Sequence, residues 1–372
     1  MMKKHKRYPG IEMTGAISID KQKQRNGALD LLRVISCCGI LYLHYRSYVS
    51  PDGVYWGDTL ITAENSGIDL RCFVEVFFVR SGYLMYSYVE RIGNGMKFGS
   101  YIAPKLWRIL PILSIGTVVY QLLSYRLFSC GQDISYAQSS LWGIISSSLG
   151  VQEGWGFLNA HINPESWFLD VLILCYIWTY ILVRICKKAG ADPRWGFGLM
   201  IFVGAACVSR ESSFPFFGYM AGRGYEAYFT GLLLAFYLKS EKKKRTGYLV
   251  AFAILAIYLL YHIFWPWLLL FGKFYLVAFF VAPALIVLAE SEAARKLLSW
   301  KGFGTIGKIT FATYVFHTVT LLGIRNLAVS FGLIIDFGHE IMLISYVFCA
   351  FAIGALAYLL VEKPVSSAAG KK

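Results

Sequence analysis

The segment ALDLLRVISCCGILYLHYRSY, residues 28–48, decides the fold class, because it is long and apolar enough to cross a bilayer and yet contains charged side chains. An ionisable group in hydrocarbon is costly unless it faces a partner or water, so such groups mark functional positions. Arg33 and His44 lie eleven residues apart. Eleven steps of about 100° complete three turns plus roughly 20°, which puts both side chains on one helix face about 16 Å apart. The segment therefore predicts a membrane helix with a polar stripe.

The composition places the whole chain in the same class. Its 372 residues are 57% hydrophobic and 16% charged, whereas soluble domains are about 45–50% apolar and about 25% charged. We therefore expect an all-α, polytopic membrane protein of about ten transmembrane helices. The first 25 residues are polar and basic and have no apolar core, so they do not form a cleavable signal peptide.

The basic residues orient the chain. Loops rich in Lys and Arg stay on the cytosolic side, and the net charge of +14 is concentrated in the tails and in alternate loops. This distribution predicts a multi-pass protein of the cell membrane with both termini cytosolic, and it argues against nucleic acid as a partner. The expected organisation is a basic cytosolic tail (1–27), a transmembrane domain (28–361) and a cytosolic C-terminal tail (362–372). The predicted spans are 28–48, 70–90, 109–128, 167–186, 195–209, 225–239, 247–265, 268–290, 309–330 and 340–361.

One apolar piece, residues 141–151, is too short for an ordinary span and is rich in Ser and Gly. We interpret it as an external interfacial or re-entrant segment. If it crosses the membrane, every later orientation reverses. The eight cysteines have no metal-binding spacing, so no metal site is expected.

His44 is the leading catalytic candidate. A histidine titrates near neutral pH, so it can take a proton from an attacking hydroxyl or carry an acyl group. Arg33 stays protonated and is suited to bind phosphate. Alternatively, Arg33 pairs only with Asp30, three residues earlier on the helix.

The second predicted span contains Glu75, Arg80 and Ser81. Glu75 can pair with Arg71, four residues before it. Arg80 has no evident partner on its own helix, so it must face another helix or a cavity. Gly82 permits either a slender ligand or a neighbouring helix to approach closely.

Three later groups are further candidates. Lys105 and Arg108 lie three residues apart at the cytosolic start of a span, where they either grip an anion or anchor the helix. Glu165 and Trp167 precede the fourth span, and Trp is common at membrane interfaces. Tyr314 and His317 belong to a polar stripe in the ninth span, which interhelical hydrogen bonds can also explain.

These residues fall in a pattern that resembles the acyltransferase 3 family of membrane acyltransferases. The matching phrases occur in the order that the family has, and they cover almost the whole chain. They are Arg25 with Leu29, Asp30, Arg33 and His44; FFVRSGY at Phe77–Tyr83; Lys105, Arg108 and Pro111; WFL at Trp167–Leu169; Tyr314 with His317; and Glu362–Pro364.

The resemblance implies transfer of an acyl group, usually acetyl, from cytosolic acyl-CoA to a hydroxyl of a cell-surface or exported polysaccharide. It implies that His44 is the base or acyl carrier, and that Arg33, Lys105 and Arg108 bind the CoA phosphates. Acyl-CoA would be a substrate, and no permanently bound cofactor is expected. The expected partners are the lipid bilayer, acyl-CoA, a glycan acceptor and separate polysaccharide-biosynthesis proteins.

Two positions depart from the family pattern. Lys105 replaces the usual first arginine and loses bidentate phosphate geometry. Arg80 stands where the family has an apolar residue. Its positive charge suits an anionic donor, so succinyl is an alternative to acetyl as the acyl group. A transporter or flippase of a lipid-linked glycan remains the alternative, because the same polar groups would line a conduit. A glycan polymerase is disfavoured, because the longest predicted external stretch is only 129–166.

Overall fold

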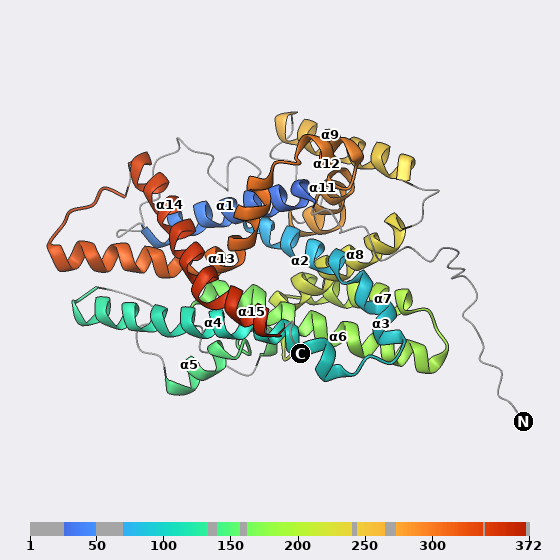
Figure 1. Ribbon diagram of the computed structural model, residues 1–372, viewed down its shortest axis with the longest axis horizontal. Helices are drawn as coiled ribbons and strands as arrows, with labels where there is room; N and C mark the ends of the chain where they lie inside the picture. The colour runs from blue at the N-terminus through green and yellow to red at the C-terminus, as the bar shows by residue number, and fades with distance from the viewer. Residues whose placement is uncertain are drawn as a thin grey trace, which may run out of the picture.

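The computed structural model describes residues 26–49, 70–132, 140–156, 162–239, 244–264, 273–337 and 339–369. Within these residues the chain is almost entirely helical, and a short antiparallel ribbon pairs β1 (Ser213–Phe214) with β2 (Phe217–Gly218). Figure 1 shows α1 (Gly27–Val49), α4 (Phe98–Ser129) and α6 (Trp167–Ala189) running roughly along the longest axis of the molecule. The all-α class that the sequence predicts is confirmed.

The remaining helices follow in chain order. They are α2 (Phe73–Leu84), α3 (Tyr86–Gly93), α5 (Leu141–Ser148), α7 (Pro193–Ser209), α8 (Tyr219–Leu238), α9 (Lys244–Phe264), α10 (Lys273–Leu276), α11 (Ala282–Ala289), α12 (Glu292–Leu297), α13 (Lys301–Phe331), α14 (Glu340–Ala357) and α15 (Lys363–Ala369). Short 3₁₀ turns are Leu70–Cys72, Glu153–Trp155 and Pro164–Ser166, and π turns are Val277–Val281 and Tyr358–Glu362.

Among the described residues, 4 helices are long and apolar enough to cross a membrane. They are Gly27–Tyr45, Phe98–Ser129, Pro164–Ala189 and Glu340–Ser367. Three shorter apolar helices accompany them: Pro193–Ser209, Thr246–Leu260 and Phe274–Ala289. The length and composition of these helices are those of a membrane protein, and a total of ten spans remains a prediction.

The helix boundaries differ from the sequence expectations around two of the candidate residue groups. The predicted span 70–90 is interrupted at Met85, where α2 ends and α3 begins. α4 begins at Phe98, so the whole second half of the predicted loop 91–108 is helical. Lys105 and Arg108 therefore lie within a helix and not in a loop before it.

Two expectations for shorter segments can also be compared with the structure. Helix α5 has 8 residues, a length of about 12 Å against a hydrocarbon core of about 30 Å, so it is too short to cross. At the C-terminus, α14 continues through the π turn into α15, so the predicted boundary at residue 361 falls inside a nearly continuous helix.

Helix α1 is held between elements that are far apart in the sequence. It packs against both α13 and α2. The approach to α13 is close: a Cβ added to Gly307 would lie 3.1 Å from Cβ of Asp30. Glycine at this position lets the start of α1 and the start of α13 share one polar region.

Helices α2 and α8 approach each other through two glycines. A Cβ added to Gly82 would lie 1.8 Å from the carbonyl oxygen of Tyr228, and one added to Gly231 would lie 1.9 Å from that of Val79. Helix packing therefore explains why residue 82 is a glycine, without a ligand that approaches at this position.

Candidate functional site

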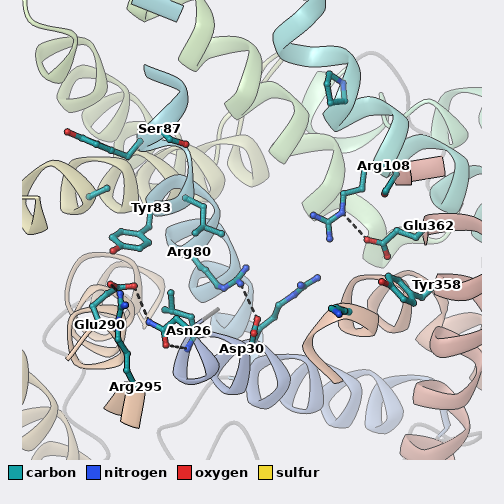
Figure 2. Close-up of a pocket in the computed structure, with 18 of the residues that line it drawn as sticks. Asn26, Asp30, Arg80, Tyr83, Ser87, Arg108, Glu290, Arg295, Tyr358 and Glu362 are labelled. Atoms are coloured by element: carbon teal, nitrogen blue, oxygen red, sulfur yellow. Dashed lines mark hydrogen bonds and ion pairs between the residues drawn. The ribbon is translucent and has the colours of Figure 1, made fainter. Parts of the chain in front are cut away.

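A large cavity opens at the beginning of α1. Its volume is about 1140 Å³, and α1, α2, α4 and the segment around Glu362 contribute to its wall. We call it the wide cavity. Figure 2 shows the Asp30–Arg80 pair and the Arg108–Glu362 pair facing each other across it, with Tyr83, Glu290 and Arg295 at its other end.

Three guanidinium groups gather at this cavity. Arg33, Arg80 and Arg108 all line it, and Arg33 is close enough to the other two for their charges to interact. We call these residues the arginine cluster. Like charges held together raise the local positive potential, and guanidinium forks match phosphate geometry. The cluster is therefore suited to bind an anion with several negative oxygens.

Each arginine is oriented by a group on another element. Nη1 of Arg33 donates to the carbonyl oxygen of Gly307 at 2.7 Å. Nε of Arg108 lies 2.9 Å from Oε1 of Glu362, and Nη2 of Arg80 lies 3.7 Å from Oδ1 of Asp30. The sequence offered Asp30 as a partner for Arg33, but the structure places it against Arg80.

A smaller cavity of about 330 Å³ continues from the same place, and we call it the narrow cavity. It shares Arg33, Arg80 and Arg108 with the wide cavity, and Ser81 and Lys105 also line it. Its wall is mostly apolar and aromatic and includes Phe77, Phe168, Tyr176 and Tyr314. The arginine cluster therefore stands where the two cavities meet.

Lys105 has a different environment from the arginines. Its Nζ lies 3.7 Å from the ring centre of Tyr88 and 3.9 Å from that of Tyr101, and it donates to the carbonyl oxygen of Tyr101 at 3.0 Å. Aromatic faces attract a cation. The ammonium group therefore sits in an aromatic cage beside the narrow cavity.

Four residues meet near the other end of α1. Nε2 of His44 lies 3.0 Å from Oε2 of Glu165, and the ring centres of His44 and His317 are 5.1 Å apart. The hydroxyl of Tyr314 donates to the carbonyl oxygen of Glu165, and Nδ1 of His317 lies against the carbonyl oxygen of Tyr314. We call His44, Glu165, Tyr314 and His317 the histidine cluster.

The loop before α6 delivers Glu165 to this cluster. Asn163 precedes it in the left-handed conformation, with φ of 52°, and its side chain bonds to α13 through the carbonyl oxygen of Val315 and the hydroxyl of Thr318. Pro164 then begins a 3₁₀ turn, which suits its fixed φ. Glu165 is thereby fixed relative to α13 as well as to α6.

Aromatic rings connect the wall of the narrow cavity to the histidine cluster. Phe77, Phe168 and Tyr314 line the cavity and contact one another, with ring centres 5.6–6.1 Å apart. The rings of Tyr314 and His317 are in turn 5.7 Å apart. Tyr314 therefore belongs to both the cavity wall and the histidine cluster.

Glu75 and Trp167 form a separate group. Glu75 is fully buried and pairs with Nε of Arg223 at 2.7 Å. The Arg223 guanidinium also lies over the rings of Trp167 and Phe274, at 4.9 and 3.9 Å. The structure brings Arg223 to Glu75 from α8, a partner that the sequence did not suggest.

The structure thus sorts the predicted residues into three places. Asp30 lies against the arginine cluster, with Ser81 and Lys105 beside it in the narrow cavity. The histidine cluster collects His44, Glu165, Tyr314 and His317. Glu75 and Trp167 lie apart, around Arg223. Sequence reasoning missed the structural importance of Glu362 and Asn163. The Asn-Pro dipeptide at 163–164 is a turn signal, but its contact with α13 has no local signature.

Comparison with known families matches residues 26–362 to the acyltransferase domain of the acyltransferase 3 family. No curated protein and no solved structure matches the chain. The match includes every residue of the two clusters. It agrees with the resemblance read from the motifs, and the chain belongs to the acyltransferase 3 family.

Proposed function

We propose that this protein is a membrane O-acyltransferase that moves an acyl group, acetyl in the simplest case, from cytosolic acyl-CoA to a hydroxyl of a cell-surface or exported polysaccharide. One observation carries the proposal: the narrow cavity runs from the arginine cluster to Tyr314, which is also a member of the histidine cluster. Arg33 lines both cavities, and Tyr314 links the narrow cavity to His44 through Glu165.

The donor's charges fit the wide cavity. CoA carries a diphosphate and a further phosphate on its ribose, and multiple arginines suit such an anion. In this assignment Arg33, Arg80 and Arg108 hold phosphate, and Lys105 adds charge at the entry to the narrow cavity. Arg80 thus serves the CoA phosphates rather than a carboxylate on the acyl chain.

The slender arm of CoA fits the narrow cavity. Apart from the arginine cluster and Lys105, the side chains in its wall are uncharged and mostly apolar or aromatic, which suits an uncharged arm that ends in a thioester. The cavity ends beside Tyr314, so the thioester is delivered toward the histidine cluster. His44 does not line the narrow cavity, so the thioester reaches it when the aromatic wall of the cavity moves.

His44 performs proton transfer at the reacting atoms. The carboxylate of Glu165 holds its imidazole in place, as the third member of a catalytic triad does. The acceptor approaches from the opposite end of α1 to the arginine cluster. In this orientation the arginine cluster faces the cytosol, and both chain termini lie on the cytosolic side.

Release of CoA from acetyl-CoA by purified protein tests this function. We expect His44→Ala to lower the rate by about 100-fold or more, because general acid–base catalysis contributes about 10²–10⁴-fold. His339→Asn is the matched control, since His339 is exposed and only caps α14, a role that asparagine also fills. A transporter or flippase would bind a glycan without cleaving the thioester, so wild-type protein that releases no CoA contradicts the proposal.

The acceptor is tested in cells. Mass analysis of envelope and exported polysaccharides should reveal an acyl group that is lost when the gene is deleted. The group should return when the gene is restored with His339→Asn but not with His44→Ala. Polysaccharides that are unchanged by the deletion would contradict the assigned acceptor class.

A further inference from the structure

His317 has a fixed hydrogen position. It is fully buried in α13, and its Nδ1 lies against the carbonyl oxygen of Tyr314. A carbonyl oxygen only accepts hydrogen bonds, so Nδ1 must carry the hydrogen. The neutral ring then presents Nε2 as a bare lone pair.

That lone pair is unsatisfied within the described residues, where Nε2 of His317 has no hydrogen-bond partner. A buried acceptor without a donor is unfavourable. The ring also lies 5.1 Å from the ring of His44, at the point where the proposed path ends. An O–H group that enters the histidine cluster would satisfy Nε2.

His44 presents a different nitrogen environment. Its Nε2 lies 3.0 Å from a carboxylate oxygen of Glu165, and a carboxylate oxygen only accepts hydrogen bonds, so this nitrogen carries a hydrogen. One histidine of the pair therefore offers a bare nitrogen, and the other holds a hydrogen against a carboxylate. A base and an acid of this kind can serve the same reaction.

We propose that the two histidines divide the proton transfers of the acyl transfer, with His317 accepting the proton of the acceptor hydroxyl and His44 protonating the departing CoA sulfur. This division rests on the proposed function. It makes His317 a catalytic residue that binds the acceptor hydroxyl, rather than a structural member of α13.

The atoms and charges balance in one turnover. The acceptor oxygen attacks the thioester carbonyl carbon while its proton passes to Nε2 of His317. The C–O bond forms, the C–S bond breaks, and its electron pair leaves on sulfur, which takes a proton from the His44 imidazolium. His317 then returns its proton to His44, and the products are the ester and CoA thiol.

The experiment compares two nucleophiles that differ in their need for a base. Water must lose a proton as it attacks, whereas hydroxylamine attacks through a nitrogen lone pair before any proton leaves. CoA release from acetyl-CoA is measured with water alone and with hydroxylamine, after subtraction of the rates without protein. Binding of CoA itself is measured in parallel to establish that each variant folds.

We expect His317→Gln to lower hydrolysis by about 100-fold and to leave hydroxylamine-dependent release within about threefold of wild type, since only hydrolysis needs the base. His317→Phe should behave in the same way, because it keeps a ring of similar size but has no lone pair. His44→Gln should lower both reactions, because sulfur needs its proton with either nucleophile. CoA affinity should be unchanged in the His317 variants, since His317 lines neither cavity.

Thr320→Val is the matched control. Thr320 is buried one turn further along α13, and its hydroxyl bonds only to the carbonyl oxygen of Phe316. Its replacement should leave both reactions intact. The division of roles is overturned if either His317 variant retains hydrolysis, or if the two reactions fall together in a variant with normal CoA affinity. Wild-type protein that binds CoA but releases none from acetyl-CoA instead overturns the proposed function.

Discussion

At the scale of single residues, the clearest lesson concerns Arg108 and Glu362. The two lie 254 positions apart and form an ion pair in which Glu362 is buried and Arg108 is half exposed. Removing one member does not have the same effect as removing the other. A buried carboxylate without its cation is costly, whereas an exposed guanidinium without its carboxylate is solvated by water.

This asymmetry predicts that Arg108→Ala lowers the free energy of unfolding by about 1–3 kcal/mol, the usual cost of leaving a buried group unsatisfied. Glu362→Gln should have a smaller effect on stability. The double variant should recover most of the stability lost in Arg108→Ala and yet bind acyl-CoA as weakly as Arg108→Ala does. Thermal unfolding and CoA titration measure the two quantities. Recovery of CoA affinity in the double variant would show that Arg108 has only a structural role.

At the scale of elements, the contact between α2 and α8 positions one wall of the site. Gly82 follows directly after Arg80 and Ser81, and its Cα faces the carbonyl oxygen of Tyr228 on α8. Any side chain at residue 82 would push the two helices apart and shift Arg80 away from Arg33 and Arg108. The glycine therefore supports both the packing of the two helices and the position of Arg80.

We expect Gly82→Ala to lower the free energy of unfolding by about 1–3 kcal/mol, as overpacking does, and to weaken CoA binding. Gly99→Ala is the control, because Gly99 lies in α4 with no heavy atom within 4 Å of an added Cβ. That substitution should stabilise the protein by about 0.5–1 kcal/mol through helix propensity. Equal effects of the two substitutions in chemical denaturation would contradict the packing argument.

At the scale of the whole molecule, the proposal requires the two clusters to lie toward opposite membrane surfaces. Cys130 follows the end of α4, is exposed, and lies on the predicted external side. Lys188 is exposed near the end of α6, on the predicted cytosolic side.

A maleimide that does not cross membranes should therefore label native Cys130 in intact cells. In a Cys130→Ser background, Lys188→Cys should react only after the cells are permeabilised. The other seven cysteines are buried or only partly exposed, and the Cys130→Ser protein measures their background. Labelling of Lys188→Cys in intact cells would reverse the orientation and place the arginine cluster outside.

The sequence alone determined the properties that depend on the spacing of residues within one segment. Helical periodicity put Arg33 and His44 on one face of α1, and the apolar composition and charge distribution indicated the all-α membrane class. The order of short motifs indicated the family. These properties follow from residue spacing within one segment, and the helix that the structure contains there, Gly27–Val49, agrees with the predicted 28–48.

Only the tertiary structure decided which residues meet. From the sequence, Arg80 had to face another helix or a cavity, and only the structure shows that it lines both cavities beside Arg33 and Arg108. Glu165 reaches His44 because Asn163 ties its loop to α13, and Glu75 meets Arg223, which comes from α8. Contacts between helices depend on their relative register and rotation, which are set by packing against many residues at once and leave no pattern in any single segment.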